Sequence, residues 1–219
     1  SRLMTIAKPL PSYLVNRYHG WRATTYAENK SWHRRLAEDG QRPRFMVIAC
    51  CDSRVDIPAV LGATTGDIFL HRNIANLIPP FEPDGEKHGT SAAIEYAVNF
   101  LKVAHIIIVA HSDCGGVKGC HDMCAGDAPE FEQKTSFIGR WLDILRPGYE
   151  RVSTVEDRGA RLTALEQQSV IVSLENLAKF PFVEKAMAEE TLTLHGMWFD
   201  IGEGRLESYD SEMDSFYPV

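Results

Sequence analysis

The chain has 219 residues, of which 44% are apolar and 24% charged, a composition typical of a globular protein with one sizeable core. The formal net charge of -7 argues against a general nucleic-acid-binding surface, and no apolar run approaches the length of a membrane span. Five cysteines without a recognisable secretory signal favour free thiols or metal ligands over a disulfide framework. We therefore expect no nucleic-acid partner, no membrane partner and a cytoplasmic location, with the proviso that a targeting segment could have been removed.

Residues 11–38 are predicted to be helical, because Leu14, Tyr18 and Trp21 recur at helical spacing. This segment precedes the first predicted strand, so it must pack either on its own core or on a second subunit. The residue pattern leaves both possibilities open.

Two short apolar runs, residues 45–49 and 106–110, predict buried strands. Neither run alternates apolar with polar residues, which is typical of strands covered on both faces in a parallel sheet. A further strand is predicted over residues 68–71, and a helix over residues 91–103 leads into the second run. This strand–helix–strand order indicates a parallel pair joined by a right-handed crossover.

The remaining elements are mostly helical and end in a hairpin. Helices are predicted over residues 58–61, 117–124, 137–145, 153–180 and 182–190. Gly202-Glu203-Gly204 separates a predicted strand over residues 191–201 from another over residues 205–209. The predicted fold is α/β, with a central, largely parallel β-sheet flanked by helices and an N-terminal helical arm. We expect one domain over residues 1–219, with the arm in residues 1–40 and the α/β core in residues 41–219.

Candidate metal ligands follow the two buried strands. Cys50 comes directly after the first apolar run, and His111 and Cys114 follow the second. The carboxyl ends of parallel strands meet at one edge of a sheet, where sites in such folds gather. Two thiolates and one imidazole suit zinc, and three protein ligands leave a position for water, as in catalytic zinc sites. Taken alone, either cysteine would be read as an ordinary buried residue.

Asp52 and Arg54 lie beside Cys50. They could form an ordinary surface ion pair. They could instead form a dyad at the metal, with Arg54 keeping Asp52 ionised and oriented while Asp52 accepts a hydrogen bond from the zinc-bound water. A third possibility is that Asp52 binds the zinc directly and closes the site.

Together these motifs resemble the β-class carbonic anhydrases, most closely the plant-type subgroup. The two site motifs are Cys50-x-Asp52-Ser53-Arg54 and His111-x-x-Cys114-Gly115-Gly116. Residues 66–69, 72–77, 89–98 and 194–196 also resemble that family. The likeness therefore covers most of the chain.

The resemblance implies a zinc enzyme with one zinc ion per subunit, held by Cys50, His111 and Cys114. It implies reversible hydration of CO2 to bicarbonate and a proton by zinc-bound hydroxide, which Asp52 and Arg54 orient. CO2 and bicarbonate would be its small-molecule partners. The family also implies a homodimer or a larger even-numbered homo-oligomer, in which the N-terminal helices embrace the neighbouring subunit.

The same resemblance implies a substrate pocket. Gln41, Phe69, Ile74 and Tyr96 fall where plant-type members line the CO2 pocket, partly from the adjacent subunit. Gly115 would offer its backbone N–H to the substrate. Without the family, Phe69, Ile74 and Tyr96 would be read as core residues and Gln41 as a solvated loop residue.

The chain departs from the family pattern at four places. Cys51 replaces a common serine, and Ala110 replaces the usual glycine before the histidine. Val47 replaces a tryptophan that helps to build an inhibitory bicarbonate site in one bacterial subgroup, which favours an open, plant-like site. The fourth departure is an extra cluster, Cys120, His121 and Cys124, which we interpret as a thiol-bearing helix face or, less readily, as a second metal site.

Three other functions compete with CO2 hydration. Relatives with the same zinc ligands hydrolyse CS2 or COS, so the motif does not separate these substrates. A non-catalytic, structural zinc would require Asp52 as a permanent fourth ligand. A redox function of Cys50 and Cys51, or of Cys120 and Cys124, ranks last, because vicinal cysteines rarely form a relaxed disulfide.

The ligand set also predicts a pH dependence. Because two thiolates cancel the formal charge of zinc, the metal should acidify its bound water less than three neutral imidazoles would. We therefore expect hydration activity to rise above neutral pH.

Overall fold

The computed structural model describes residues 6–85 and 88–219, so the expectation for the first five residues lies outside it. The chain divides into two compact units, residues 1–41 and residues 42–219. Of the helices within the described residues, none has the length and hydropathy that crossing a bilayer requires.

The N-terminal unit is helical, as predicted. Its elements are α1 (Ser12–Trp21), a π-helical turn (Arg22–Tyr26) and α2 (Lys30–Asp39). The Trp21 ring packs on Tyr26 and His33 at centroid distances of 5.5 and 5.9 Å. None of the residues in these three elements is buried within the chain. The unit's own packing therefore leaves its apolar side chains at least partly exposed.

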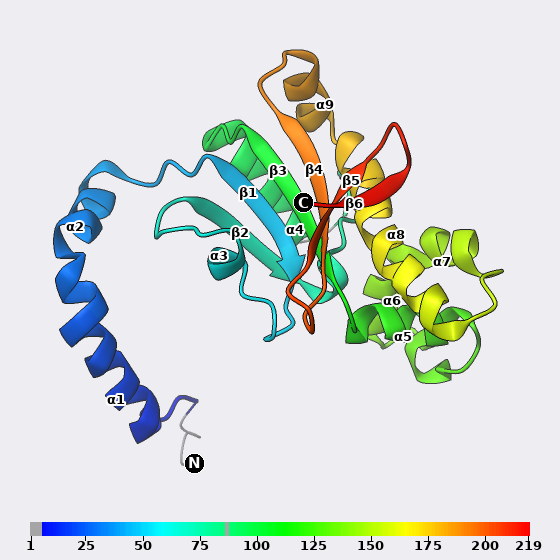
Figure 1. Ribbon diagram of the computed structural model, residues 1–219, viewed down its shortest axis with the longest axis horizontal. Helices are drawn as coiled ribbons and strands as arrows, with labels where there is room; N and C mark the ends of the chain where they lie inside the picture. The colour runs from blue at the N-terminus through cyan, green and yellow to red at the C-terminus, as the bar shows by residue number, and fades with distance from the viewer. Residues whose placement is uncertain (1–5, 86–87) are drawn as a thin grey trace. The chain divides into compact units, whose positions relative to one another are not determined.

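The second unit is built on a six-stranded sheet in the order β2-β1-β3-β4-β5-β6 (Figure 1). The strands are β1 (Phe45–Cys50), β2 (Ile68–Asn73), β3 (His105–His111), β4 (Thr193–Phe199), β5 (Leu206–Asp210) and β6 (Ser215–Pro218). The first four run parallel, and β5 and β6 are added antiparallel. The expected α/β fold with a largely parallel sheet is confirmed.

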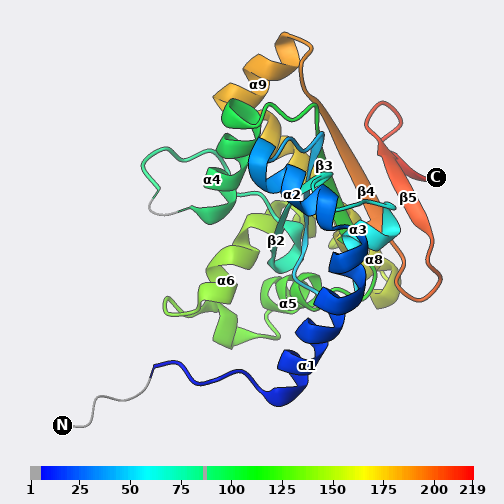
Figure 2. The same ribbon diagram turned by 90° about the vertical axis from the view of Figure 1, so that its left-hand side faces the viewer.

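Helices cover the faces of this sheet, and two of them lie beyond the carboxyl ends of its parallel strands. They are α3 (Ile57–Val60), α4 (Gly89–Glu95), α5 (Gly115–Cys124), α6 (Phe137–Leu142), α7 (Arg146–Val152), α8 (Arg158–Ala178) and α9 (Pro181–Ala188). Single turns occupy Ile74–Asn76, Tyr96–Phe100, Pro129–Glu132 and Asp143–Leu145. Figures 1 and 2 show α5 and α6 beyond the carboxyl ends of the parallel strands.

The central strands are apolar because both of their faces are buried. On one face, Met46 and Ile108 belong to a core that includes Val170 of α8 and Val183 of α9. On the other face, Val47, Ala49 and Val109 pack with Ile57 of α3. A third cluster joins α5, α6 and α8. Burial on both faces makes β1 and β3 a rigid base for the residues that follow them.

Several predicted boundaries were wrong. The predicted helix over residues 153–180 begins only at Arg158, because Asp157 caps it by accepting a hydrogen bond from the Ala160 N–H. A turn separates α8 from α7, and α7 itself was not predicted. Helix α5 begins at Gly115 rather than at residue 117, and β2 continues to Asn73. Strand β6 was also not predicted, because its four residues carry little alternation.

Candidate metal centre

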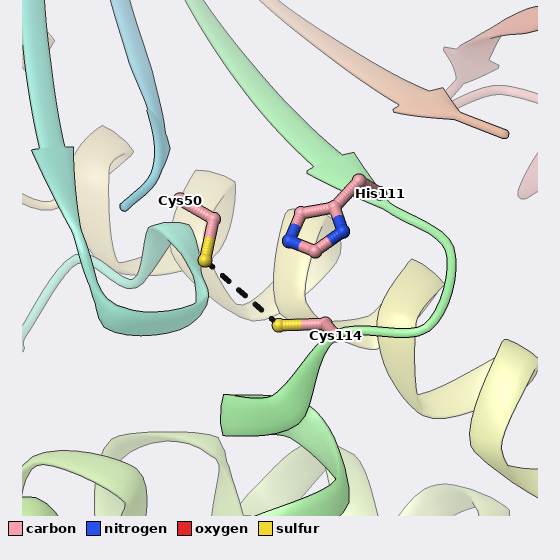
Figure 3. A group of neighbouring side chains, drawn as sticks. All are labelled: Cys50, His111 and Cys114. Carbon is pink, nitrogen blue, oxygen red and sulfur yellow. Dashed lines mark hydrogen bonds between the residues drawn. The ribbon is translucent and has the colours of Figure 1, made fainter. Parts of the chain in front are cut away.

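Three side chains from distant parts of the sequence converge at the carboxyl edge of the sheet (Figure 3). Cys50 ends β1, His111 ends β3, and Cys114 immediately precedes α5. All three are buried, and their potential ligand atoms lie within 4.8 Å of one another. The two sulfur atoms are 4.0 Å apart. The group could therefore hold a metal ion.

The His111 ring is oriented for coordination through one nitrogen. Its Nδ1 is 2.8 Å from the carbonyl oxygen of Ser112, which can only accept, so Nδ1 carries the proton. Nε2 then carries a lone pair, and this buried atom has no hydrogen-bond partner within the described part of the chain. Buried polar atoms without partners are rare in native proteins. An ion between Nε2 and the two sulfurs would satisfy it.

The two thiols influence each other strongly. A hydrogen bond from Cys114 is the largest cause that lowers the pKa of Cys50 to about 4. Cys114 shows the opposite change, because its hydrogen bond to Cys50 and its burial raise its pKa. The backbone N–H of Ala75 also donates to the Cys50 sulfur, at 3.4 Å. The metal-free pair thus shares one proton, and the donor set of two sulfurs and one imidazole fits zinc.

Asp52 lies beside this group and is held by Arg54. The guanidinium Nε donates to Oδ1 at 3.0 Å and Nη2 to Oδ2 at 2.7 Å, while the Arg54 backbone N–H also donates to Oδ1. Nη2 further reaches the carbonyl oxygen of Asp113. These hydrogen bonds hold the pKa of the Asp52 carboxyl well below its usual range. Oδ2 lies 3.8 Å from Nε2 of His111.

Arg72 of β2 orders the backbone around Cys50. Its Nε donates to the carbonyl oxygen of Cys50 at 2.7 Å and its Nη2 to that of Asp52 at 2.6 Å. This contact fixes the segment in which Cys50 points inward, whereas Cys51 is exposed. Arg72 lies in the segment of residues 72–77 that resembles the family, but its place in the sequence did not indicate this role.

Comparison with known proteins gives the family. The family model described as carbonic anhydrase matches residues 45–206. Beta carbonic anhydrase 3 of Arabidopsis thaliana is 34% identical over 197 residues, which cover 87% of this chain and 73% of the relative. The chain belongs to the β-carbonic anhydrase family.

Solved β-carbonic anhydrases have the same fold. The structure of CcaA matches with a TM-score of 0.86 and 26% identity, over 95% of this chain and 91% of CcaA. A tetrameric β-carbonic anhydrase from the ascomycete Sordaria macrospora matches with a TM-score of 0.76 and 33% identity, over 90% and 95% of the two chains.

The residues expected to line a β-carbonic anhydrase substrate pocket are partly together. Phe69 and Tyr96 stack with ring centroids 5.9 Å apart, and Phe100 continues the stack at 5.6 Å from Tyr96. Ile74 and Tyr96 are 41% and 46% exposed, so they are not core residues within one chain. Gly115 directly follows Cys114 at the start of α5. Gln41 belongs to the N-terminal unit.

The extra cysteine cluster does not bring three ligands together. The sulfurs of Cys120 and Cys124 lie 4.0 Å apart, but both nitrogens of His121 are engaged. Its Nδ1 is 2.9 Å from Oδ1 of Asp122, and its Nε2 accepts from Nε of Arg161 at 2.9 Å. These contacts favour the thiol-bearing helix face over a metal site with His121.

One buried carboxylate behind the centre was missed by the sequence analysis. Glu166 of α8 is only 5% exposed and accepts a hydrogen bond from the Trp198 indole at 3.1 Å. Backbone hydrogen bonds from Cys114 and Asp113 also reach it, and its burial raises its pKa. The available signal was its position on α8, on the same helical stripe as Val170 and Ser173.

Proposed function

We propose that the chain catalyses the zinc-dependent, reversible hydration of CO2 to bicarbonate and a proton. One zinc ion per subunit would be held by Cys50, His111 and Cys114. The observation that carries this proposal is the buried, unpartnered Nε2 of His111 beside two sulfurs 4.0 Å apart. Membership of the β-carbonic anhydrase family supports the reaction.

When bound, zinc would acidify a water molecule and so supply the nucleophile for CO2. The chain's own residues set the charge and direction of that chemistry. Both thiols would give up their protons, and His111 would use the lone pair on Nε2 while Ser112 accepts its Nδ1–H. The two thiolates would balance the formal charge of the ion.

Asp52 is proposed to orient the nucleophile. Both of its oxygens are held by Arg54, so the carboxylate stays ionised and its position is determined by two parallel hydrogen bonds. A carboxylate held in this way can accept a hydrogen bond but is not free to swing towards a new partner. This supports the role of an orienting group over that of a permanent fourth zinc ligand.

The substrate would lie against a small apolar wall. Phe69, Ile74 and Tyr96 are proposed to form it, and the backbone N–H of Gly115 is proposed to contact the substrate. Gln41 stays a predicted lining residue from the family resemblance. The stacked rings of Phe69 and Tyr96 and the exposure of Ile74 and Tyr96 support an apolar surface that is only partly buried in the core.

We propose that the chain forms an even-numbered homo-oligomer. The tetrameric relative from Sordaria macrospora supports this. Exposed aromatic side chains on the second unit, notably Tyr96 and Phe100, also support a face that a neighbouring subunit covers. A cytoplasmic location remains a prediction.

Stopped-flow CO2 hydration combined with metal analysis tests the proposal. Purified protein should contain one zinc per chain and accelerate hydration well above the buffer rate. His111→Ala should lose both, whereas Cys124→Ser should retain both and serves as the matched control. Hydrolysis of CS2 or COS without CO2 hydration, or bound zinc without any turnover, would contradict it.

A further inference from the structure

Two histidines meet on the sheet at the edge opposite the metal centre. His105 is the first residue of β3, and His195 is the third residue of the neighbouring strand β4 (Figure 1). The two strands are paired so that His105 lies opposite Thr193 and Ile107 lies opposite His195. His105, Thr193 and His195 therefore project from the same face of the sheet. All three are exposed.

Nitrogen atoms of the two rings lie within hydrogen-bond distance of each other and of one hydroxyl group. Nε2 of His195 is 3.3 Å from Nδ1 of His105, with the rings inclined edge to face. The hydroxyl of Thr193 lies 2.6 Å from the His105 nitrogen and 2.8 Å from the His195 nitrogen. Three atoms that could bind a metal ion, two ring nitrogens and one hydroxyl oxygen, thus form one compact triangle at the surface.

This spacing suits coordination. Two imidazole nitrogens bound to one tetrahedral zinc ion at about 2.0–2.1 Å are about 3.3–3.4 Å apart. The observed separation of 3.3 Å therefore needs no movement of the strands. Partial desolvation and the neighbouring His105 both lower the pKa of His195, which favours the neutral ring that can donate a lone pair.

We propose that His105 and His195 form a second metal site, which takes a divalent late transition-metal ion such as Zn2+. Nδ1 of His105 and Nε2 of His195 are its protein ligands, the Thr193 hydroxyl lies at its edge, and solvent completes the coordination. With two protein ligands and an exposed position, the site is weaker than the buried centre and exchanges its ion with solution.

The proposed site is separate from the catalytic chemistry. His105 begins the strand that ends at His111, so the two sites lie at opposite ends of β3. A metal ion at His105 and His195 would tie the amino ends of β3 and β4 together. Binding that occurs only in the folded state raises folding stability by mass action. The predicted signature is a second zinc equivalent that stabilises the protein without changing turnover.

Calorimetric titration of the full, zinc-loaded chain with further Zn2+ tests the site. The wild-type protein should take up one more equivalent, more weakly than the first, and its thermal midpoint should rise with the added zinc. His105→Asn and His195→Asn should each lose this second equivalent and the thermal shift. Both should retain the first zinc and normal CO2 hydration.

Two controls separate this site from other weak zinc ligands. His19→Asn, at an exposed histidine of α1, should bind the second equivalent as the wild type does, and so should Cys124→Ser. Absence of a second equivalent in the wild type would overturn the proposal. So would its retention in either site variant, or its loss in the Cys124→Ser variant.

Discussion

Oδ2 of Asp52 lies 3.8 Å from Nε2 of His111, beside the space shared with the two thiols. The two atoms do not form a hydrogen bond, because Nδ1 of His111 carries the ring proton, so Nε2 and the carboxylate oxygen can both only accept. The remaining lone pairs of the carboxylate are free to accept a hydrogen bond from a group bound beside Nε2. The end of β1 and the loop after it thus supply a candidate metal ligand and a charged acceptor only two residues apart.

Replacing Asp52 with Asn should lower CO2 hydration about 100-fold or more, because positioned acid–base groups contribute on that scale. The amide keeps the size of the side chain but loses the charge and the second acceptor oxygen. Stopped-flow rates and zinc content should be measured together, and zinc should stay at one per chain. Asp56→Asn is the control, since Asp56 caps α3 and Asn caps equally well. Full activity of the Asp52 variant would exclude it from the mechanism.

In the metal-free protein, Cys50 should be a thiolate at neutral pH. Its pKa of about 4 depends mainly on the hydrogen bond from Cys114. Cys114→Ala removes that donor, so the Cys50 titration should move towards the ordinary thiol value. The difference in ultraviolet thiolate absorbance between each protein and its Cys50→Ser derivative measures this midpoint. An unchanged midpoint in Cys114→Ala would show that the sulfur–sulfur contact does not set it.

The same depressed pKa has a consequence for stability. Because the folded value lies below the unfolded value of 9.0, the contribution of Cys50 is complete above pH 9 and is lost as the pH falls towards 4. The unfolding free energy of the metal-free wild type, relative to its Cys50→Ser variant, should therefore rise with pH over this range. A difference that does not depend on pH would contradict the shift.

Two adjacent glycines should respond differently to alanine. A Cβ on Gly116 would lie 2.7 Å from Cγ2 of Ile74 and 3.1 Å from Cβ of Ala75, whereas one on Gly115 meets nothing within 4 Å. Gly116→Ala should therefore displace the segment that donates to Cys50, costing about 1–3 kcal/mol of stability and weakening zinc binding. Gly115→Ala should be tolerated. Denaturant unfolding and zinc competition measure both effects, and equal behaviour of the two variants would refute the steric argument.

Glu166 should make stability depend on pH in the opposite sense to Cys50. Burial raises its folded pKa above 4.5, so ionisation opposes folding, and its contribution falls as the pH rises through the folded value. Glu166→Gln keeps an acceptor for the Trp198 indole and removes the charge. Its thermal midpoint relative to wild type should be higher at pH 8 than at pH 5. Glu184→Gln, on the first turn of α9, should show no such trend.

The strands that carry the centre were predictable because their residues are apolar on both faces. Residues 45–49 and 106–110 gave β1 and β3 nearly to their ends, and the α/β fold followed from the helix between them. The start of α8 was missed because the residues before Asp157 are compatible with a helix. Only the Asp157 cap and the separate helix α7 show that α8 begins at Arg158. Strand β6 depends on pairing with β5, which its own residues do not indicate.

The sequence by itself determined the candidate metal-binding residue types, their placement after two buried strands and the family. It could do so because strand burial and motif spacing are written in neighbouring residues. Only the tertiary structure decided which side chains face one another across long separations. Glu166 with Trp198 and His105 with His195 lie 32 and 90 residues apart, and each pair meets through sheet and helix packing. Local sequence pattern carries no information on such pairs, because their geometry is set by the register and packing of elements distant along the chain.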